Sequence, residues 1–431
     1  MSELLFGGRA PRLWLRIEQD ADKLYYAQVP ADLADGFIVN ANLIEHSPAA
    51  VAAFLDKLER PFVVDPMSYR FARPAWYLHE RDGEVANKRN YGRLWQKYAT
   101  GVAGLSGDPL VDGGTDRLAG DAAVLRFCQN VLEFQDRSLR HAWIDEVAGY
   151  VGMDRLFGYQ LAPLAFLAPY TVITNDADLE TAVTLAAAAA SLDRAVIAVV
   201  PLLPAALSDP ELLRRTVLGM ATSGVGGVLV WPVGLSAFAL AETPALFTGL
   251  AMLVRGLADA GLEVGMLYGG ILSGLLRGFG LAGFSHAVMY GETRGLDPTG
   301  GRPATQFYFP PLRAFLPYGR AAELVVPLSE SDYLATVCAC EICRSLLRRP
   351  GSDVSAFFET YVPDGAKRPF PTQVAQDLNR FHFLYARADE LALARSRTEP
   401  ALLADLLTAA DRYPMGVTRT IRAWAERLKS A

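Results

Sequence analysis

Three of the four cysteines in this 431-residue chain lie close together, at Cys338, Cys340 and Cys343. A Cys-x-Cys pair does not readily close a disulfide on itself, and three thiolates with one imidazole are a usual tetrahedral ligand set for structural zinc. His382 is the candidate fourth ligand, because apolar residues recur around it at near-helical spacing after Pro371. The pattern predicts a structural Zn²⁺ site. The simpler alternative is a core histidine beside three buried thiols.

A second group of candidate residues follows short apolar runs that are expected to be strands. Asp65 comes directly after residues 62–64, so we expect its carboxylate at the end of a strand. An aspartate before a proline is also a common turn residue, which is the structural alternative. His286 and Glu292 lie in and after the last such run, where Glu292 could equally form a surface ion pair with Arg294. The candidate catalytic residues are Asp65, His286 and Glu292, which lie at or after expected strand ends. Burial can tune the pKa of a carboxylate for acid-base catalysis.

Aromatic residues and glycines near the same strand ends could hold a flat ligand. Trp231 and Tyr268 could enclose a ring, and Tyr69 follows Asp65 closely. Gly269 and Gly270 would let the backbone approach a planar or phosphate-bearing ligand. Each of these candidate substrate contacts has a structural alternative, because aromatic residues at strand ends often only pack and paired glycines often form a turn.

The elements that must position these residues alternate between short apolar runs and helical patterns. Seven strands, each expected in a β-α unit, are predicted at residues 37–42, 61–65, 170–173, 194–200, 227–231, 263–268 and 284–290. An eighth strand is expected at residues 323–326. Nearly continuous apolar strands are typical of sheets covered on both faces. The order predicts an α/β fold, a (β/α)8 TIM-like barrel, with a doubly wound open sheet as the alternative.

We predict a barrel domain over residues 1–330, with an insertion on its functional rim at about 66–118. Residues 331–431 are predicted to form a zinc-binding helical subdomain packed on the barrel. The composition is that of an ordinary globular protein, with 51% hydrophobic and 20% charged residues. Clustered cysteines, no secretory signal pattern and no apolar run suited to a membrane span predict a cytoplasmic protein.

The net charge of −6 argues against nonspecific nucleic-acid binding by the whole surface, but it allows a local basic face. Arg294, Arg344 and Arg348 lie around the cysteine cluster in the sequence and are candidate phosphate contacts. Other basic residues in this region are Arg302, Arg313, Arg320, Arg349, Lys367 and Arg368. The alternative is a solvated face near a dimer contact.

From about residue 37 to 393 the sequence resembles the tRNA-guanine transglycosylases. The Cys-x-Cys-x-x-Cys cluster and the His382 segment at 381–390 resemble the zinc site of that family, although the gap between Cys343 and His382 is longer than usual there. Further segments resemble the family strand that ends in a base-handling Asp, its glycine-bearing substrate strand and its last two β-α units. They are residues 64–68, 226–230, 265–270 and 283–286.

The resemblance implies a base-exchanging pentosyltransferase. In that family an Asp attacks the anomeric carbon of a nucleotide and displaces guanine. The covalent intermediate then accepts a 7-deazaguanine, while a second Asp manages the proton. This chain has Ser285 or His286 where the nucleophile is expected, and the nearest carboxylate beyond them is Glu292. The family signature Asp-Ser-Gly-Gly-Phe is also absent after Asp65.

Three functions therefore remain open. The first is a transglycosylase-like enzyme that exchanges a guanine-type base in tRNA or DNA for a 7-deazaguanine, with Asp65 as base-recognition acid or proton handler. The second is a non-catalytic, zinc-stabilised protein that binds nucleic acid or serves as a partner subunit, as some family members do. The third is an unrelated barrel enzyme with a structural zinc. We expect tRNA or DNA as a partner, a homodimer or heteromeric partner as an option, and no membrane.

Overall fold

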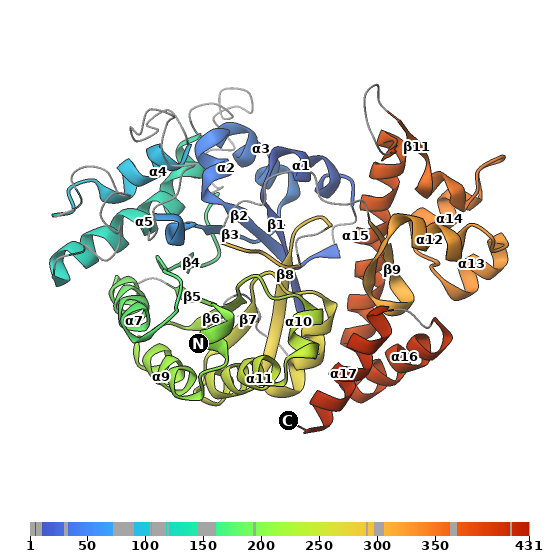
Figure 1. The fold of residues 1–431 in the computed structure, drawn as a ribbon. Helices are drawn as coiled ribbons and strands as arrows, with labels where there is room; N and C mark the ends of the chain where they lie inside the picture. The colour runs from blue at the N-terminus through green and yellow to red at the C-terminus, as the bar shows by residue number, and fades with distance from the viewer. Residues whose placement is uncertain are drawn as a thin grey trace.

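The computed structural model describes residues 5, 11–29, 33–71, 90–103, 105, 118, 120–142, 144, 161–192, 195–289, 292–296, 306–362, 369–413 and 416–430. Its centre is a barrel of eight parallel strands (Figure 1). They are β1 (Arg12–Ile17), β2 (Gly36–Asn40), β3 (Phe62–Asp65), β4 (Phe166–Leu167), β5 (Val196–Leu202), β6 (Gly227–Pro232), β7 (Glu263–Met266) and β8 (Leu281–His286).

Successive strands of the barrel pair in parallel, and β8 pairs with β1. Between the two edge strands β3 and β4, the backbone N–H of Leu164 donates to the carbonyl oxygen of Phe62 at 2.8 Å. This bond brings the sheet nearly to closure. The predicted (β/α)8 class is confirmed, and the carboxyl ends of all eight strands meet at one mouth.

Two strand predictions need correction. Residues 323–326 are wrong as the eighth strand, because they lie at the end of helix α12 (Tyr318–Val325), where Val325 is buried and Val326 is 43% exposed. Tertiary packing thus overrides the β-propensity of the two valines. The missing strand is β1, whose apolar run is interrupted by Arg16, an arginine that is fully buried. The strand predicted at 170–173 is displaced, since β4 ends at Leu167.

Outer helices follow most strands and surround the barrel (Figure 1). They are α1 (Asp20–Tyr26), α2 (Ala41–His46), α3 (Pro48–Leu58), α5 (Asp121–Ala142), α7 (Asp176–Ala190), α8 (Pro204–Leu207), α9 (Pro210–Thr222), α10 (Ala237–Glu242) and α11 (Pro244–Asp259). Side chains cap several of them, as where Asp209 accepts from the backbone N–H of Leu212 at the start of α9. After β7 the expected helix is a 3-10 helix, η7 (Ile271–Phe279).

The predicted rim insertion at about 66–118 is described only in part. Its described elements are a 3-10 helix, η2 (Ser68–Phe71), and the helix α4 (Asn90–Ala99). Tyr98 of α4 donates its hydroxyl to the carbonyl oxygen of Pro66 at 3.2 Å, which ties this helix to the chain just beyond β3. Residues 72–89, 104, 106–117 of the insertion lie outside the described residues.

A C-terminal module of helices and short hairpins stands beside the barrel (Figure 1). Its first part contains β9 (Gln306–Phe309), η8 (Pro310–Leu312), β10 (Ala314–Pro317), α12, α13 (Glu330–Thr336) and α14 (Glu341–Leu347). The rest is η9 (Val354–Phe358), β11 (Thr360–Tyr361), β12 (Phe370–Pro371), α15 (Gln373–Ser396), α16 (Glu399–Arg412) and α17 (Gly416–Ser430). None of the helices in the described ranges is long and apolar enough to cross a membrane.

Helix α15 takes the place of the eighth outer helix. On one side, Tyr25 of α1 donates its hydroxyl to Asp377 at 2.7 Å. On the other side, Arg277 of η7 donates to the carbonyl oxygen of Ala394 at 3.4 Å. Between them, Phe383 packs on His286 of β8, with ring centroids 5.3 Å apart. The same helix therefore covers the barrel and belongs to the C-terminal module, and the domain boundary near 330 stays a prediction.

Removing the Phe383 ring tests this placement of α15. Phe383 is 0% exposed and contacts Tyr308 and Phe315 at centroid distances of 5.1 and 5.2 Å. Phe383→Ala should lower the free energy of unfolding by about 3–5 kcal/mol, because a buried ring leaves a cavity. Urea unfolding followed by circular dichroism measures the change. Leu393→Ala, at a 39% exposed position of the same helix, is the control and should change the free energy of unfolding less. A loss for Phe383→Ala no larger than that of the control would contradict the packing.

Candidate functional site

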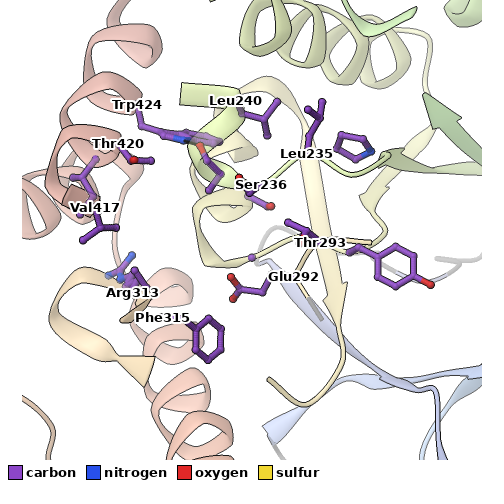
Figure 2. A pocket seen from close by; sticks show the side chains of 18 of the residues that line it. Leu235, Ser236, Leu240, Glu292, Thr293, Arg313, Phe315, Val417, Thr420 and Trp424 are labelled. Carbon is purple, nitrogen blue, oxygen red and sulfur yellow. Dashed lines mark hydrogen bonds between the residues drawn. The ribbon is translucent and has the colours of Figure 1, made fainter. Parts of the chain in front are cut away.

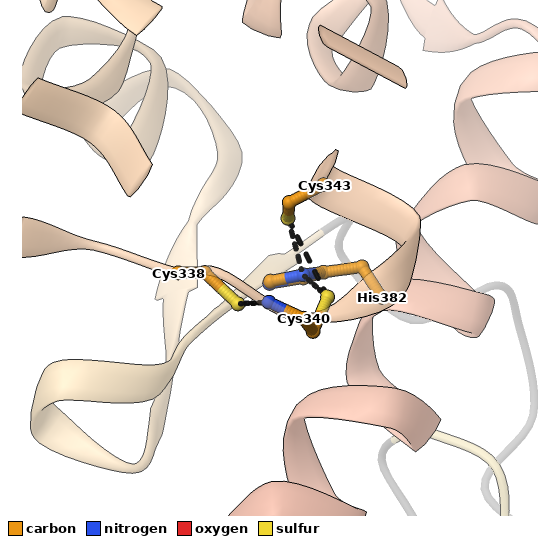
Figure 3. A group of neighbouring side chains, drawn as sticks. All are labelled: Cys338, Cys340, Cys343 and His382. Carbon is orange, nitrogen blue, oxygen red and sulfur yellow. Dashed lines mark hydrogen bonds between the residues drawn. The ribbon is translucent and has the colours of Figure 1, made fainter. Parts of the chain in front are cut away.

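The four predicted metal ligands come together in the C-terminal module (Figure 3). The three Sγ atoms of Cys338, Cys340 and Cys343 and one ring nitrogen of His382 all lie within 4.8 Å of one another. His382 Nδ1 is 3.3 Å from Cys343 Sγ and 3.6 Å from Cys340 Sγ. All four side chains are buried. The group can hold a metal ion, and three sulfurs with one nitrogen suit a tetrahedral ion of intermediate softness.

Local structure explains how the cysteines converge. Cys338 and Cys340 lie in the short connection between α13 and α14, and Cys340 is the N-cap residue of α14. The backbone N–H of Cys340 donates to Cys338 Sγ at 3.4 Å, which folds the connection onto itself. Cys343 lies in the first turn of α14, so its sulfur reaches Cys340 Sγ at 3.5 Å. Helix α15 supplies His382 from the opposite side.

Neighbouring groups fix the orientation of these ligands. His382 Nε2 lies 2.9 Å from the carbonyl oxygen of Tyr308, so Nε2 carries the proton and Nδ1 directs its lone pair at the sulfurs. The ring also stacks on Phe307 at a centroid distance of 4.9 Å. The hydroxyl of Tyr333 lies 3.1 Å from Cys343 Sγ and can donate to a thiolate there. Such support is typical of a metal site rather than of a chance cluster of thiols.

Asp65 lies at the barrel mouth, as predicted, but its carboxylate is fully engaged. It forms an ion pair with Arg16 at 2.7 Å, and both side chains are 0% exposed. The hydroxyl of Tyr170 donates to Oδ1 at 2.7 Å, and the backbone N–H of Met67 donates to the same atom at 3.0 Å. Asp65 thus lies inside a buried network in which its charge is already neutralised, although Arg16 Nη1 has no hydrogen-bond partner among the described residues.

The predicted substrate contacts Tyr69, Trp231 and Tyr268 pack on one another in the same mouth. Tyr69 meets the Trp231 ring edge-on at 5.0 Å and stacks on Tyr170 at 5.6 Å. Trp231 lies 5.1 Å from Tyr268, over whose ring the Arg16 guanidinium sits at 4.2 Å. None of these aromatic residues is more than 4% exposed. Together with Arg16 they fill the space where a flat ligand was expected.

Arg294, a predicted phosphate contact, is also held at this mouth. Its guanidinium forms an ion pair with Glu18, which follows β1, and its carbonyl oxygen accepts from Trp231 Nε1 at 3.2 Å. Burial acts to raise the pKa of Glu18, but Arg294 and Arg16 together hold that pKa below its usual value. The charges of Arg294, Arg16, Glu18 and Asp65 are therefore paired with one another.

Backbone strain gathers at this end of the barrel. Met67, Tyr268 and Met289 follow β3, β7 and β8 and have φ angles of 55°, 58° and 48°. For residues other than glycine this left-handed conformation costs about 1–2 kcal/mol each. Such strain persists only where the surroundings enforce it, and it is common at functional sites. Here the surroundings that enforce it are the packed aromatic residues and ion pairs of the mouth.

His286, at the end of β8, is 0% exposed beneath α15. Burial and the nearby Arg387 lower the pKa of His286 to about 3, so its ring is neutral at pH 7. Its Nδ1 lies 3.0 Å from the carbonyl oxygen of Ala287. The His286 ring is enclosed by protein. It is therefore not exposed at the barrel mouth, where a catalytic histidine would meet a substrate.

Glu292, the third predicted catalytic residue, forms an ion pair with Arg387 of α15. Arg387 is fully buried and also pairs with Glu390 at 2.9 Å, while the Tyr308 hydroxyl donates to Glu390 at 2.8 Å. Burial raises the pKa of Glu292, and Arg387 opposes the rise. A Cβ atom on Gly270 would lie 2.7 Å from Glu292 Oε2. Gly270 therefore makes room for this carboxylate, and both residues line one pocket between the barrel and the C-terminal module.

Gly269 is also in a place with little room for a side chain, since an added Cβ would lie 2.7 Å from Ser273 Oγ.

Sequence reasoning missed the ion-pair partners Arg16, Arg387 and Glu390. For Arg16 a signal existed, because an arginine inside the apolar run 13–17 must find a buried anion. For Arg387 and Glu390 the signal was their position on α15 one and two turns after His382.

Comparison with known proteins does not identify a family for this chain. No protein-family model matches the chain, and no curated protein matches it either. What the molecule does must therefore be inferred from the metal group, the filled mouth and the surfaces around them.

Two predicted phosphate contacts, Arg344 and Arg348, are exposed on and just after α14, and Arg349 beside them is also exposed. Within the described ranges, no ion pair joins any of these three arginines to a carboxylate. They form a small cationic surface next to the metal group. The basic residues Arg302, Lys367 and Arg368 lie outside the described residues.

Removing the Asp65 carboxylate tests whether Asp65 is structural. Asp65→Ala should lower the free energy of unfolding by about 3–5 kcal/mol, because it leaves the Arg16 guanidinium buried without a partner. Urea unfolding measures the loss. Asp411→Ala is the matched control, since its side chain is 73% exposed and pairs with Arg422 at the surface, where we expect less than about 1 kcal/mol. If Asp65→Ala lowers the free energy of unfolding no more than Asp411→Ala does, the buried Arg16 guanidinium does not need the Asp65 carboxylate.

Proposed function

We propose that this protein is a non-catalytic, metal-stabilised barrel that binds nucleic acid as the partner subunit of a base-exchanging enzyme. The observation that carries the proposal is the state of Asp65, which is fully buried and neutralised by Arg16 at 2.7 Å. A residue that handles a base must present free hydrogen-bonding atoms to it. The packed rings of Tyr69, Trp231 and Tyr268 leave no opening for a base beside Asp65.

Base exchange by this chain itself is the competing proposal. It would require Asp65 to leave both Arg16 and Tyr170, at a cost of several kcal/mol for an unpaired buried charge. It would also require a nucleophile, and the nearest carboxylate beyond β8, Glu292, is paired with Arg387. The geometry therefore favours the non-catalytic proposal, while the resemblance to the transglycosylases is common to both.

The surface that we propose for nucleic acid is the one formed by Arg344, Arg348 and Arg349. These arginines are exposed beside the Cys₃His group, and in the described part of the chain none of them forms an ion pair, although the charge of Arg344 acts on Asp389. In a protein with a net charge of −6, such a surface concentrates positive charge where the rest of the molecule does not. Phosphate contacts release counterions, so binding there must weaken as salt rises.

We further infer that the metal is Zn²⁺ and that the protein works in the cytoplasm. Three thiolates and one imidazole, closed on all sides by protein, are the donor set of structural zinc sites. The ligands that hold it would be Cys338, Cys340, Cys343 and His382, and the metal would join α14 to α15. A reducing compartment keeps such thiols available for a metal.

The metal proposal predicts about one equivalent of zinc in protein purified without chelator. Cys343→Ser should lose the metal and lower the Tm, because the site joins two helices of the module. Cys128→Ser is the matched control: Cys128 is equally buried but lies on α5, outside the cluster. Elemental analysis and thermal unfolding give the two readouts. Less than about half an equivalent of zinc in the unaltered protein would contradict a closed structural site.

The functional proposal predicts binding of tRNA or duplex DNA without base exchange. Fluorescence anisotropy should show an affinity that falls steeply with salt. The double variant Arg344→Glu, Arg348→Glu should reduce the slope of log affinity against log salt by about 2. Arg214→Glu and Arg422→Glu, which change exposed arginines elsewhere, are the controls and should have little effect.

The same preparations are tested for incorporation of labelled guanine and 7-deazaguanines into tRNA and duplex DNA. We expect incorporation no higher than that of the Asp65→Asn variant. Incorporation that requires Asp65 would establish the competing enzymatic proposal. Binding that does not depend on salt, or that is unaffected by the double charge reversal, would rule out the arginine surface as the nucleic-acid site.

A further inference from the structure

A pocket of about 350 Å³ lies in the seam between the barrel mouth and the C-terminal module (Figure 2). Its barrel side is formed by the segments after β6, β7 and β8, and its other side by the β9–β10 hairpin and α17. Neither Asp65, Arg16 nor any member of the Cys₃His group lines the pocket, but Tyr268, whose ring lies under the Arg16 guanidinium, does. Its volume is at the small end of the range for ligand pockets in proteins.

One wall of the pocket is apolar. Leu240 of α10 and Val417, Ile421 and Trp424 of α17 line it, and all four are at least nine-tenths buried. Helix α17 is held in place there, because Trp424 Nε1 donates to the carbonyl oxygen of Ala237 at 3.0 Å. The wall is therefore fixed before any ligand arrives, which lowers the cost of binding.

Arg313 is the polar group that points to a ligand. It lies at the end of η8, lines the pocket and is only 8% exposed. Within the described residues, its guanidinium forms no ion pair and no hydrogen bond to another side chain, and its charge acts on Glu390 only through space. A cation that is nearly buried is costly without a partner. An acceptor supplied by a ligand would remove this cost.

Glu292 provides a second polar group with the opposite charge. Its side chain is 23% exposed and lines the same pocket, although it also pairs with Arg387 behind the wall. Glu292 and Glu390 together carry two negative charges, and Arg387 and Arg313 carry two positive charges. A ligand with a single charge could pair with Arg313 or with Glu292, but not with both. A ligand that carries both charges could pair with both.

We propose that the seam pocket binds a small zwitterion with an apolar body, of the chemical class of an α-amino acid with a large apolar side chain. Arg313 receives the carboxylate, Glu292 receives the ammonium group, and the apolar body lies against the wall formed by Leu240, Val417, Ile421 and Trp424. Binding would join α17 and the β9–β10 hairpin to the barrel. The site shares Tyr268 with the packed rings of the mouth but includes neither Asp65 nor the cationic surface, so it can be tested apart from the proposed function.

Calorimetric titration of the full-length, metal-loaded protein with L-leucine, L-phenylalanine and L-tryptophan tests the proposal. At least one of them should bind saturably, with a dissociation constant between about 1 μM and about 1 mM for a ligand of this size. Two analogues of phenylalanine serve as matched ligands: 3-phenylpropionate lacks the ammonium group and 2-phenylethylamine lacks the carboxylate. Each should bind at least about tenfold more weakly than phenylalanine, because each leaves one charge of the pocket unanswered.

Arg313→Gln should weaken binding at least about tenfold. Arg320→Gln is the control variant, because Arg320 lies in the same module but is exposed and paired with Glu323. If Arg313→Gln fails to fold, Arg313→Lys and the two analogues on the unaltered protein decide the question. The proposal is overturned if none of the three amino acids binds, if the one-charge analogues bind equally well, or if binding is the same without Arg313.

Discussion

The attachment of His382 is the interaction on which the rest of the molecule depends. Its Nε2 is held by the carbonyl oxygen of Tyr308 and its Nδ1 faces the cysteine sulfurs, so the position of α15 is fixed along its length. The next residue of the same helix, Phe383, packs on His286 of β8, and Arg387, just over one turn beyond His382, pairs with Glu292. The contacts of His382 within the Cys₃His group thus do more than join α15 to the C-terminal module. They also position the helix that covers the last strand of the barrel.

The barrel mouth follows a different principle. Its charges are matched internally, with Arg16 on Asp65 and Arg294 on Glu18, and its aromatic rings pack on one another. A mouth of this kind is packed like a core, because its rings are buried and its charges are paired, although the hydroxyls of Tyr69 and Tyr268 have no hydrogen-bond partner among the described residues. The features that could meet a ligand lie outside this packed region. Among the described residues they include the exposed arginines beside the Cys₃His group and the pocket in the seam, where Arg313 forms no ion pair.

Sequence patterns predicted the fold class and all four members of the Cys₃His group, because both depend on the spacing of residues that are close in the sequence. The thiols lie within one short segment, and most strands are continuous apolar runs. The pairing of Arg16 with Asp65 spans 49 positions of the chain, and that of Arg387 with Glu292 spans 95. No periodicity encodes such pairs. Strand β1 was hidden for the same reason, since Arg16 looks out of place in a strand until its buried partner is known.

The position of α15 also constrains the order in which the protein can be made. Strand β8 ends at His286, but the helix that covers it begins at Gln373. A growing chain emerges from the ribosome N-terminus first. The barrel must therefore wait, with one flank bare, while the hairpins and cysteines of the module are synthesised. The flank beside β8 can be covered only once α15 has been synthesised, which is also when His382 can first meet the thiols.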